Sequence, residues 1–295
     1  MQIKIALPKG RYLEETSALL QEAGWGLSGY HENGRLYRLK SRKFPNLLAK
    51  IFHEKDIPIQ VAVGNYDLGI CGLDWTEELL TKYPSSALVK IRNLGYGDGV
   101  LSMVASRSSG ASTIEEIRVK SGIIRIASEY PNLAESFALN LRLRRFNVFP
   151  LWGAAEVYPP ESAELALIPG GIDGGLFSYD LVPVRHVLSF NAFLIANRNS
   201  WESKDMDDIL ASIGDSLVGG EKCSSLEGAV ETPEVAGQYL SREEAEKIVR
   251  LALPDGHQQL PTVKLLNKAG IRLMITHHQR EIVDQLPICQ RSRLR

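Results

Sequence analysis

Hydrophobic positions at the start of the chain alternate and then change their spacing. The segment 3–7 alternates apolar and other residues and is rich in β-branched residues, which predicts a strand. The run Pro8-Lys9-Gly10-Arg11 breaks this pattern. Apolar residues then recur at helical spacing over 13–23, and Gly24 stands where a C-cap glycine closes a helix. The sequence therefore opens with a strand–loop–helix unit.

The same alternation of patterns continues along the chain. Strands are expected at 57–63, 68–71, 95–104, 123–127, 147–152, 165–168 and 182–196. Helices are expected at 74–83, 113–119, 132–144 and 205–213. Asp74 is expected to cap the first of these, with Glu77 at the capping-box position, and Ser112 or Thr113 to open the second. Strands that alternate with helices predict an α/β fold with largely parallel sheets.

The C-terminal part of the chain has a different pattern. Residues 219–237 are rich in Gly, Ser and Glu without periodicity, which predicts a linker, and a helix is expected at 241–251, capped by Ser241. Residues 5–27 also align without a gap on 251–273, with 10 of 23 positions identical. In the second copy Asp255 replaces Lys9 and His257 replaces Arg11. This predicts a degenerate repeat of the first unit.

Composition narrows the class of protein only slightly. A chain of 295 residues, 44% of them hydrophobic and 23% charged, suits a globular protein of about two domains. The formal net charge of -1 gives no general attraction to nucleic acid or membrane. The cysteines Cys71, Cys223 and Cys289 form no CxxC pair, so neither a zinc site nor a disulfide framework is expected. The first apolar run is too short for a signal peptide, and a cytoplasmic location is expected.

Candidate ligand-binding residues follow the predicted strands. Lys9 and Arg11 flank Gly10 in a strand-to-helix turn, where two cations and free helix N–H groups could hold an anion. A solvated basic turn is the alternative. Ligands in α/β sheets bind at the carboxyl ends of strands, and the next strands are bounded by glycines and aspartates: Asp67, Gly69, Gly72 and Asp74. Ordinary turn chemistry, with Asp74 as a helix cap, is the alternative there.

Two further segments could contribute to such a site. Glu156 follows a predicted strand and could accept hydrogen bonds from a ribose or an amino group, or be a plain surface acid. The glycine-rich run 169–175 could form a backbone nest for an anion, or a flexible turn. Its candidate residues are Gly170, Gly171, Asp173, Gly174 and Gly175. It lacks the patterns of a P-loop and of a dinucleotide-binding loop. No metal ligand set is expected.

Six segments together resemble the ATP phosphoribosyltransferase family over roughly residues 1–200. They are Ala6-Leu7-Pro8-Lys9-Gly10-Arg11; Asp56-Ile57-Pro58 with Val63 and Gly64; Asp67-Leu68-Gly69-Ile70 with Gly72 and Asp74; Asn93-Leu94-Gly95-Tyr96-Gly97; Arg125-Ile126-Ala127-Ser128-Glu129-Tyr130-Pro131-Asn132-Leu133; and Trp152-Gly153-Ala154-Ala155-Glu156. No single segment is decisive, and it is their common order that carries the resemblance.

The resemblance implies a two-domain fold like that of the periplasmic binding proteins, with a cleft. Domain I would span 1–98 and 188–215, domain II 99–187, and a small C-terminal α/β segment 216–295. The implied reaction joins N1 of ATP to C1 of phosphoribosyl pyrophosphate, with Mg²⁺ on the departing pyrophosphate. Lys9 and Arg11 would contact phosphates, Asp74 and its glycines the adenine, and Glu156 the ribose. A homo-oligomer is also implied.

The phosphate loop departs from the pattern of the family. The family has an acidic residue and then Thr-Gly-x-Thr-Leu. This chain has Ile168 at the acidic position, and the residues between Ile168 and Ser178 include neither Thr nor Ser. Its glycines could keep part of the phosphate site, and Asp173 would oppose a phosphate. An impaired homologue acting as a nucleotide-binding or regulatory subunit is therefore the alternative function, and a solute-binding protein a third. The segment 254–263 also resembles part of the family's histidine-binding regulatory domain, which competes with the repeat.

Overall fold

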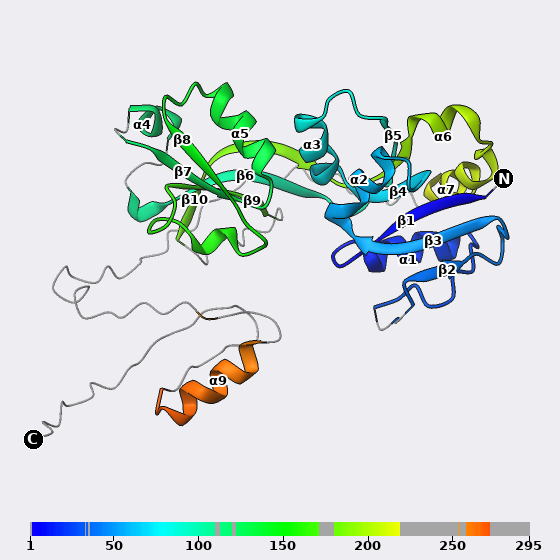
Figure 1. Cartoon of the computed structure of the whole chain (residues 1–295), viewed down its shortest axis with the longest axis horizontal. Coiled ribbons are helices and arrows are strands. Elements are labelled where there is room, and N and C mark those ends of the chain that lie inside the picture. Colours follow the sequence, from blue (N-terminus) through cyan, green and yellow to red (C-terminus); the bar gives the residue numbers. More distant parts are fainter. Residues whose placement is uncertain are drawn as a thin grey trace, which may run out of the picture. The chain divides into compact units, whose positions relative to one another are not determined.

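A computed structural model of the chain describes residues 2–32, 34, 36–109, 113–119, 122–170, 180–218, 253 and 258–271. The chain divides into two compact units, Met1–Cys223 and Ser224–Arg295. The first unit contains two β-sheets, shown with their helices in Figure 1. No helix among these described residues is long and apolar enough to cross a membrane.

The first sheet has six strands, and the chain enters it at its centre. In spatial order they are β2 (Arg38–Lys40), β3 (Leu47–His53), β1 (Ile3–Lys9), β4 (Leu68–Gly72), β11 (Ala192–Asn197) and β5 (Leu88–Asn93). Strand β1 pairs in parallel with β3 and β4, whereas β2 and β11 run antiparallel to their neighbours. The carboxyl ends of β1, β3 and β4 therefore share one edge, which is where ligands bind in α/β sheets.

Five helices accompany the first sheet. They are α1 (Leu13–Glu22), α2 (Ile57–Ala62), α3 (Leu73–Lys82), α6 (Arg198–Ser203) and α7 (Asp207–Val218), and the 3-10 turn η1 (Glu54–Asp56) precedes α2. Helix α1 ends as predicted, because Gly24 has a φ of 71° and the N–H of Trp25 donates to the carbonyl of Leu20. The Trp25 ring is fully buried and its Nε1–H donates to Ser212 of α7 at 2.9 Å. We call this sheet with its helices the first lobe.

The second sheet has five strands, and we call it with its helices the second lobe. In spatial order the strands are β10 (Leu181–Phe190), β6 (Gly99–Ser106), β9 (Leu165–Gly170), β7 (Ile124–Ser128) and β8 (Phe146–Pro150). Its helices are α4 (Ile114–Val119) and α5 (Pro131–Asn140), with the 3-10 turns η2 (Arg107–Ser109) and η3 (Ala155–Val157). Strand β7 runs parallel to β8 and β9, so these three also end at one edge.

The predicted α/β fold class is confirmed, and the chain passes between the two sheets twice, once from β5 to β6 and once from β10 to β11. The prediction of largely parallel sheets is wrong, because both sheets are mixed: β2 and β11 pair antiparallel with their neighbours in the first sheet, and β10 and β6 do so in the second. Thr113 opens α4 as expected, because its hydroxyl accepts from the N–H of Glu116 at 3.3 Å while its own N–H donates to the Glu116 carboxylate at 3.0 Å. The predicted domain boundaries, including 216–295 as a separate segment, stay a prediction.

Several predicted elements change in the structure. The segment predicted as a strand at 57–63 forms α2, in which Ile57, Pro58 and Val61 are buried. Asp74 does not cap α3, whose N-cap is Gly72 without a side-chain hydrogen bond. Its carboxylate has partners elsewhere, as described below. The predicted extended run 182–196 is two strands, and the predicted helix 132–144 ends at Asn140.

The second unit is described only around one helix, α9 (Gln259–Lys268). Its bounds coincide with those of α1 when the repeat alignment is applied, and its C-terminus closes in the same way. Gly270 has a φ of 82°, and the N–H of Ile271 donates to the carbonyl of Leu266. The strand half of the repeat, the linker 219–237 and the helix at 241–251 lie outside the described residues.

Candidate functional site

The turn after β1 places Lys9 beside a hollow of about 610 Å³. The hollow is lined by Lys9, Gly10, Arg11, Leu13, Glu14, Glu15, His31, Glu32, Gly34, Leu36, Tyr37 and Ile51. Gly10 has a φ of 89°, which favours glycine, and its carbonyl accepts from the N–H of Leu13 at 3.0 Å. Among the described residues, no side chain forms a capping hydrogen bond at the start of α1. The Lys9 ammonium forms no ion pair with any acidic side chain that the structure describes, and lies 5.9 Å from the Tyr37 ring centroid. Lys9 is thus available to an anion, although the acidic residues of the first α1 turn oppose one.

Arg11 is held by the protein itself. Its Nη2 donates to Asp74 Oδ2 at 2.6 Å, its Nε lies 2.9 Å from the nearer Glu54 oxygen, and its side chain is 31% exposed. The guanidinium also lies over two rings, 4.6 Å from the centroid of Tyr12 and 4.8 Å from that of Phe190. Burial acts to lower the pKa of Arg11, but the two carboxylates outweigh it and raise that pKa. Arg11 therefore links Glu54 and Asp74 within the protein.

Asp74 follows β4 at the start of α3 and is fully buried. Its Oδ2 accepts from Arg11 and, at 2.7 Å, from the hydroxyl of Tyr130. Its Oδ1 has no hydrogen-bond partner among the described residues. Burial first, and then the Asp74 charge, raise the pKa of Tyr130, so this hydroxyl is a donor. Because Tyr130 follows β7, the Asp74–Tyr130 bond joins the first lobe to the second.

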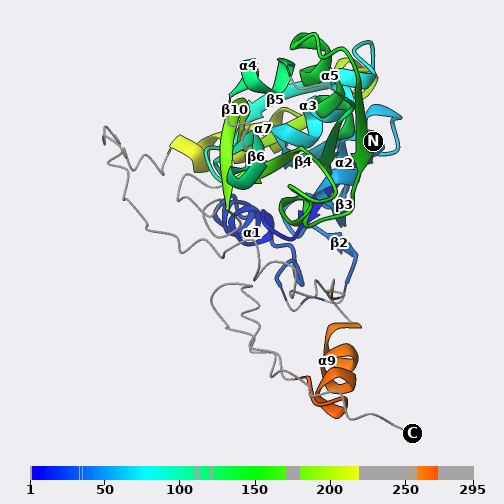
Figure 2. The ribbon, with the colours of Figure 1, turned by 90° about the vertical axis from the view of Figure 1, so that its left-hand side faces the viewer.

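A second group of bonds joins helix α3 of the first lobe to helix α5 of the second. The two helices lie side by side in both views (Figures 1 and 2). The Glu78 carboxylate of α3 accepts from the N–H groups of Asn132 and Leu133, both at 2.9 Å, in the first turn of α5. A carboxylate at a helix N-terminus satisfies N–H groups that have no partner inside the helix. The ring of Trp75 meets that of Tyr130 at a centroid distance of 4.3 Å. Residues 74, 75 and 78 therefore hold the start of α5.

Charged groups of both lobes also gather beyond the ends of β3, β7 and β8. The ammonium of Lys55 lies 4.3 Å from the ring centroid of Trp152, whose side chain is 88% exposed. Burial raises the pKa of Glu129; Lys55 opposes this shift and Glu156 adds to it. Glu156 is half-buried in η3. The strand ends thus bring together cations, carboxylates and one open aromatic ring.

The other predicted site residues lie in different places. Asp67 precedes β4 and lies at its amino end, where its carboxylate accepts from Ser200 at 2.6 Å and Lys204 at 2.8 Å. Gly69 lies inside β4, where a β-carbon would come within 2.8 Å of α2 side chains. At Gly72 a β-carbon would meet Arg11 Nη2 at 2.8 Å. Gly170 ends β9, whereas Gly171, Asp173, Gly174 and Gly175 lie outside the described residues.

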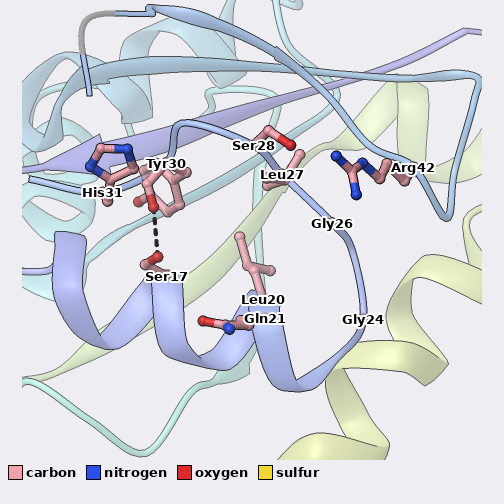
Figure 3. Close-up of a pocket in the computed structure, with 10 residues that line it drawn as sticks. All are labelled: Ser17, Leu20, Gln21, Gly24, Gly26, Leu27, Ser28, Tyr30, His31 and Arg42. Atoms are coloured by element: carbon pink, nitrogen blue, oxygen red, sulfur yellow. Dashed lines mark hydrogen bonds between the residues drawn. The ribbon is translucent and has the colours of Figure 1, made fainter. Parts of the chain in front are cut away.

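A second hollow, of about 420 Å³, lies beside α1 and contains none of the predicted site residues. Leu20 and Leu27 lie between Tyr30 and His31 at one end and Arg42 at the other (Figure 3). The hydroxyl of Ser17 donates to the carbonyl of Tyr30 at 2.6 Å across its rim. His31 lines this hollow as well as the one beside Lys9.

Several residues of the site were not singled out from the sequence as functional. Glu54 and Lys55 follow the strand β3, and Glu129 and Tyr130 follow β7. A search for charged or aromatic residues directly after each strand could have found them, because the carboxyl ends of parallel strands share an edge. Trp75 and Glu78 carry no such signal, since their partners are more than fifty residues away.

Two α/β lobes meet at the carboxyl ends of their parallel strands, and Lys9, at the end of β1, forms no ion pair with a described acidic side chain; these features define a two-lobed α/β protein whose candidate site lies at the strand ends. The family model described as ATP phosphoribosyltransferase matches residues 53–215. The ATP phosphoribosyltransferase of Aquifex aeolicus is 32% identical over 69% of this chain and 88% of its own length. This chain therefore belongs to the ATP phosphoribosyltransferase family, whose members are phosphoribosyl-transferring glycosyltransferases of histidine biosynthesis.

Other relatives show how much of the chain is shared. The Prosthecochloris aestuarii enzyme is 29% identical over 68% of this chain, and the match spans 65% of its own length. The Chlorobium luteolum enzyme is 26% identical over 96% of this chain and 98% of its own length. A solved ATP phosphoribosyl transferase (HisG:HisZ) complex from Thermotoga maritima has the same fold, with a TM-score of 0.62 at 18% identity, covering 74% of this chain and all of that chain.

Proposed function

We propose that this chain catalyses the condensation of ATP with phosphoribosyl pyrophosphate to phosphoribosyl-ATP and pyrophosphate. Family membership supports the reaction class. The observation that carries the proposal is that four charged residues lie at the carboxyl ends of parallel strands: Lys9 is the last residue of β1, and Lys55, Glu129 and Glu156 come after β3, β7 and β8. Residues from two lobes can then hold two substrates against each other, which is the main requirement of a transfer between them.

The charges suit the two halves of the transfer. As the bond between C1 and pyrophosphate breaks, negative charge grows on the pyrophosphate and positive charge on the ribose ring. Lysines stabilise the first and carboxylates the second. We assign Lys9 to a phosphate group and Glu156, with Glu129 beside it, to the ribose. Asp74 and its glycines stay proposed for the adenine side, and Arg11 would act by holding the Lys9 turn in place.

Mg²⁺ is proposed as part of the pyrophosphate-bearing substrate. The described residues contain no group of three or more His, Cys, Asp or Glu side chains that could hold a metal ion. The ion would neutralise pyrophosphate charge as the substrate binds. The glycines from Gly170 to Gly175 are proposed to supply backbone N–H groups to the 5′-phosphate. Gly170 ends β9, whose carboxyl end lies at the same edge of the second sheet as that of β7, which Glu129 follows.

The reaction is tested directly with purified protein, ATP, phosphoribosyl pyrophosphate, Mg²⁺ and a pyrophosphatase that pulls the equilibrium, with the absorbance of phosphoribosyl-ATP as readout. Product formation is expected, and Lys9→Ala should lower kcat/KM by roughly 10–100-fold, the loss of one charge-assisted contact of about 1.5–3 kcal/mol. Lys40→Ala, an exposed lysine of β2, is the matched control and should change nothing. Absence of product from the wild-type protein at high concentration would overturn the proposal.

Assembly is a separate part of the proposal. A homo-oligomer is proposed from the family resemblance, and a partner subunit from the two-protein complex in which the Thermotoga structure was solved. Light scattering of the purified chain tests the homo-oligomer, and a monomer at assay concentration would overturn that part of the proposal. A cytoplasmic location is proposed from composition.

A further inference from the structure

Tyr130 crosses from one lobe to the other at a fully desolvated point. It occupies the N-cap position of α5, is only 2% exposed, and its hydroxyl donates to Asp74 Oδ2 at 2.7 Å. A buried hydrogen bond to a charged acceptor is stronger than a neutral one, because no water competes for either partner. This bond therefore holds the start of α5 against the start of α3.

The acceptor oxygen connects Tyr130 to the turn that carries Lys9. Asp74 Oδ2 also accepts from Arg11, which lies two residues after Lys9 and is held on its other side by Glu54. Gly72 leaves the space for this contact, since a β-carbon there would come within 2.8 Å of Arg11 Nη2. The chain Tyr130–Asp74–Arg11 thus runs without a gap from the second lobe to the phosphate-side turn of the first.

Glu78, one helical turn after Asp74 on α3, adds a second contact with the start of α5. Residues 74, 75 and 78 occupy one face of α3, and all three meet the beginning of α5, at Tyr130, Asn132 and Leu133. Glu78 satisfies backbone N–H groups and would hold α5 in place without Tyr130. The Tyr130 hydroxyl adds a side-chain restraint, because it donates to the same carboxylate oxygen that holds Arg11.

We propose that Tyr130 is a positioning residue whose hydroxyl, through Asp74 and Arg11, fixes the second lobe relative to the Lys9 turn. The proposal rests on the proposed function, since the orientation matters only when each lobe holds one substrate. Without the hydroxyl the lobes spend less time in the competent orientation, and substrate binding must restore it. The apparent affinity then falls by the competent fraction while the rate from the bound state is kept.

The test compares Tyr130→Phe with a matched control, Tyr96→Phe. Tyr96 is also a largely buried tyrosine, but its hydroxyl bonds to Thr16 at 2.7 Å within the first lobe. For Tyr130→Phe we expect the KM of each substrate, measured with the other held far below its own KM, to rise by the same factor, about three- to tenfold, while kcat at saturation of both substrates stays within twofold. Tyr96→Phe should leave both KM values unchanged. A lowered kcat with unchanged KM values, which a loss of folded enzyme would give, overturns the proposal. KM values for Tyr130→Phe that equal those of Tyr96→Phe also overturn it.

A second readout separates this proposal from the proposed function. In protein labelled with 5-fluorotryptophan, the ¹⁹F signal of Trp75, assigned through Trp75→Phe, reports on the ring beside Tyr130. Tyr130→Phe should broaden or shift that signal in the free protein, and saturating ATP should move it back toward its wild-type position. A Trp75 signal indifferent to ATP in the variant overturns the proposal. If the wild-type protein makes no product, the proposed function fails, while the ¹⁹F comparison in the free protein still decides whether the hydroxyl restrains the lobes.

Discussion

The ammonium of Lys55 lies over the Trp152 ring, 4.3 Å from its centroid, and thereby joins η1 of the first lobe to the loop after β8 in the second. Trp152 is 88% exposed, so most of its ring contacts none of the residues that the structure describes. An exposed cation–π contact contributes only about 0.5–1 kcal/mol, which does not explain an open tryptophan at a strand end. We propose that the open ring is a stacking surface for a nucleobase.

Trp152→Ala should therefore weaken ATP binding with little effect on stability. Loss of base stacking on an aromatic ring costs about 1–3 kcal/mol, so the dissociation constant from calorimetry should rise roughly 5- to 150-fold. The free energy of unfolding should change by less than about 1 kcal/mol. Trp152→Phe, which keeps an aromatic face, should recover most of the affinity, and Trp201→Ala in α6 serves as the control. An unchanged dissociation constant for Trp152→Ala would remove the ring from the binding site.

Glu54 predicts a specific pH dependence of stability. Burial raises the pKa of its carboxyl from 4.5 to about 7, against the opposing pull of Arg11. Between these two values the folded chain binds more protons than the unfolded chain, so the contribution to stability is full below about pH 4.5 and is lost as the pH rises through about 7. Glu54→Gln stays neutral and should lose this dependence.

Urea unfolding between pH 5 and pH 8 measures the effect. The difference in free energy of unfolding between wild type and Glu54→Gln should shift by on the order of 1–3 kcal/mol over this range, with the wild type relatively more stable at the acidic end. Glu202→Gln, an exposed glutamate of α6, should follow the wild-type curve. Parallel curves for wild type and Glu54→Gln would show that the folded-state pKa is ordinary.

Asp67 is predicted to support the fold of the first lobe. Its carboxylate, 5% exposed, is paired with Lys204 at 2.8 Å and also accepts from Ser200 and from the N–H of Lys4. Removing one partner leaves a buried charge without compensation, so Asp67→Ala should lower the free energy of unfolding by about 3–5 kcal/mol. Because Asp67 lies at the amino end of β4, the KM values of protein still folded at low temperature should not change.

The control for Asp67 is an exposed ion pair. Glu77 pairs with Lys90 at 2.6 Å, but the two side chains are 27% and 43% exposed, so Glu77→Ala should cost no more than about 1 kcal/mol. Urea unfolding and steady-state kinetics on the same preparations separate stability from binding. A stable Asp67→Ala protein with a raised KM would place Asp67 in the ligand site instead.

The different placements of Asp67 and Asp74 show what could be predicted from the sequence. Alternating patterns predicted the α/β class and most strands, because these patterns are local. The pattern over 57–63 predicts a strand because α2, with six residues, is too short to show helical periodicity. A strand over 57–63 would place Asp67 after its carboxyl end; the structure has helix α2 there, and Asp67 instead precedes β4. Asp67 therefore lies at the amino end of β4 and Asp74 beyond its carboxyl end, so only Asp74 lies at the edge where ligands bind in α/β sheets.

The partners of Asp74 could not be predicted in the same way. Its position after a strand was visible, but Tyr130 lies 56 residues away and in the other lobe. Which groups meet there depends on how two sheets pack, and no local pattern encodes it. Arg11 was assigned to a phosphate for the same reason, since its two acidic partners are 43 and 63 residues away.

Gly69 predicts a packing effect that tests the change from strand to helix at 57–62. A β-carbon at this position would lie 2.7 Å from Ile57 Cγ2 and 2.8 Å from Val61 Cγ2, both on α2, in the centre of the first sheet. Real contacts at such distances do not occur, so Gly69→Ala should displace α2 and cost about 1–3 kcal/mol in urea unfolding. Val61→Ala alone should also be destabilising, because it leaves a cavity.

The two substitutions together decide between packing and backbone effects. In Gly69→Ala/Val61→Ala the new methyl group enters the space that the valine leaves. The costs should therefore not add, and the coupling energy of the double-mutant cycle should favour the pair by about 0.5–2 kcal/mol. If residues 57–62 formed a strand, Gly69 and Val61 would not meet in this way, and the two costs would add within about 0.5 kcal/mol.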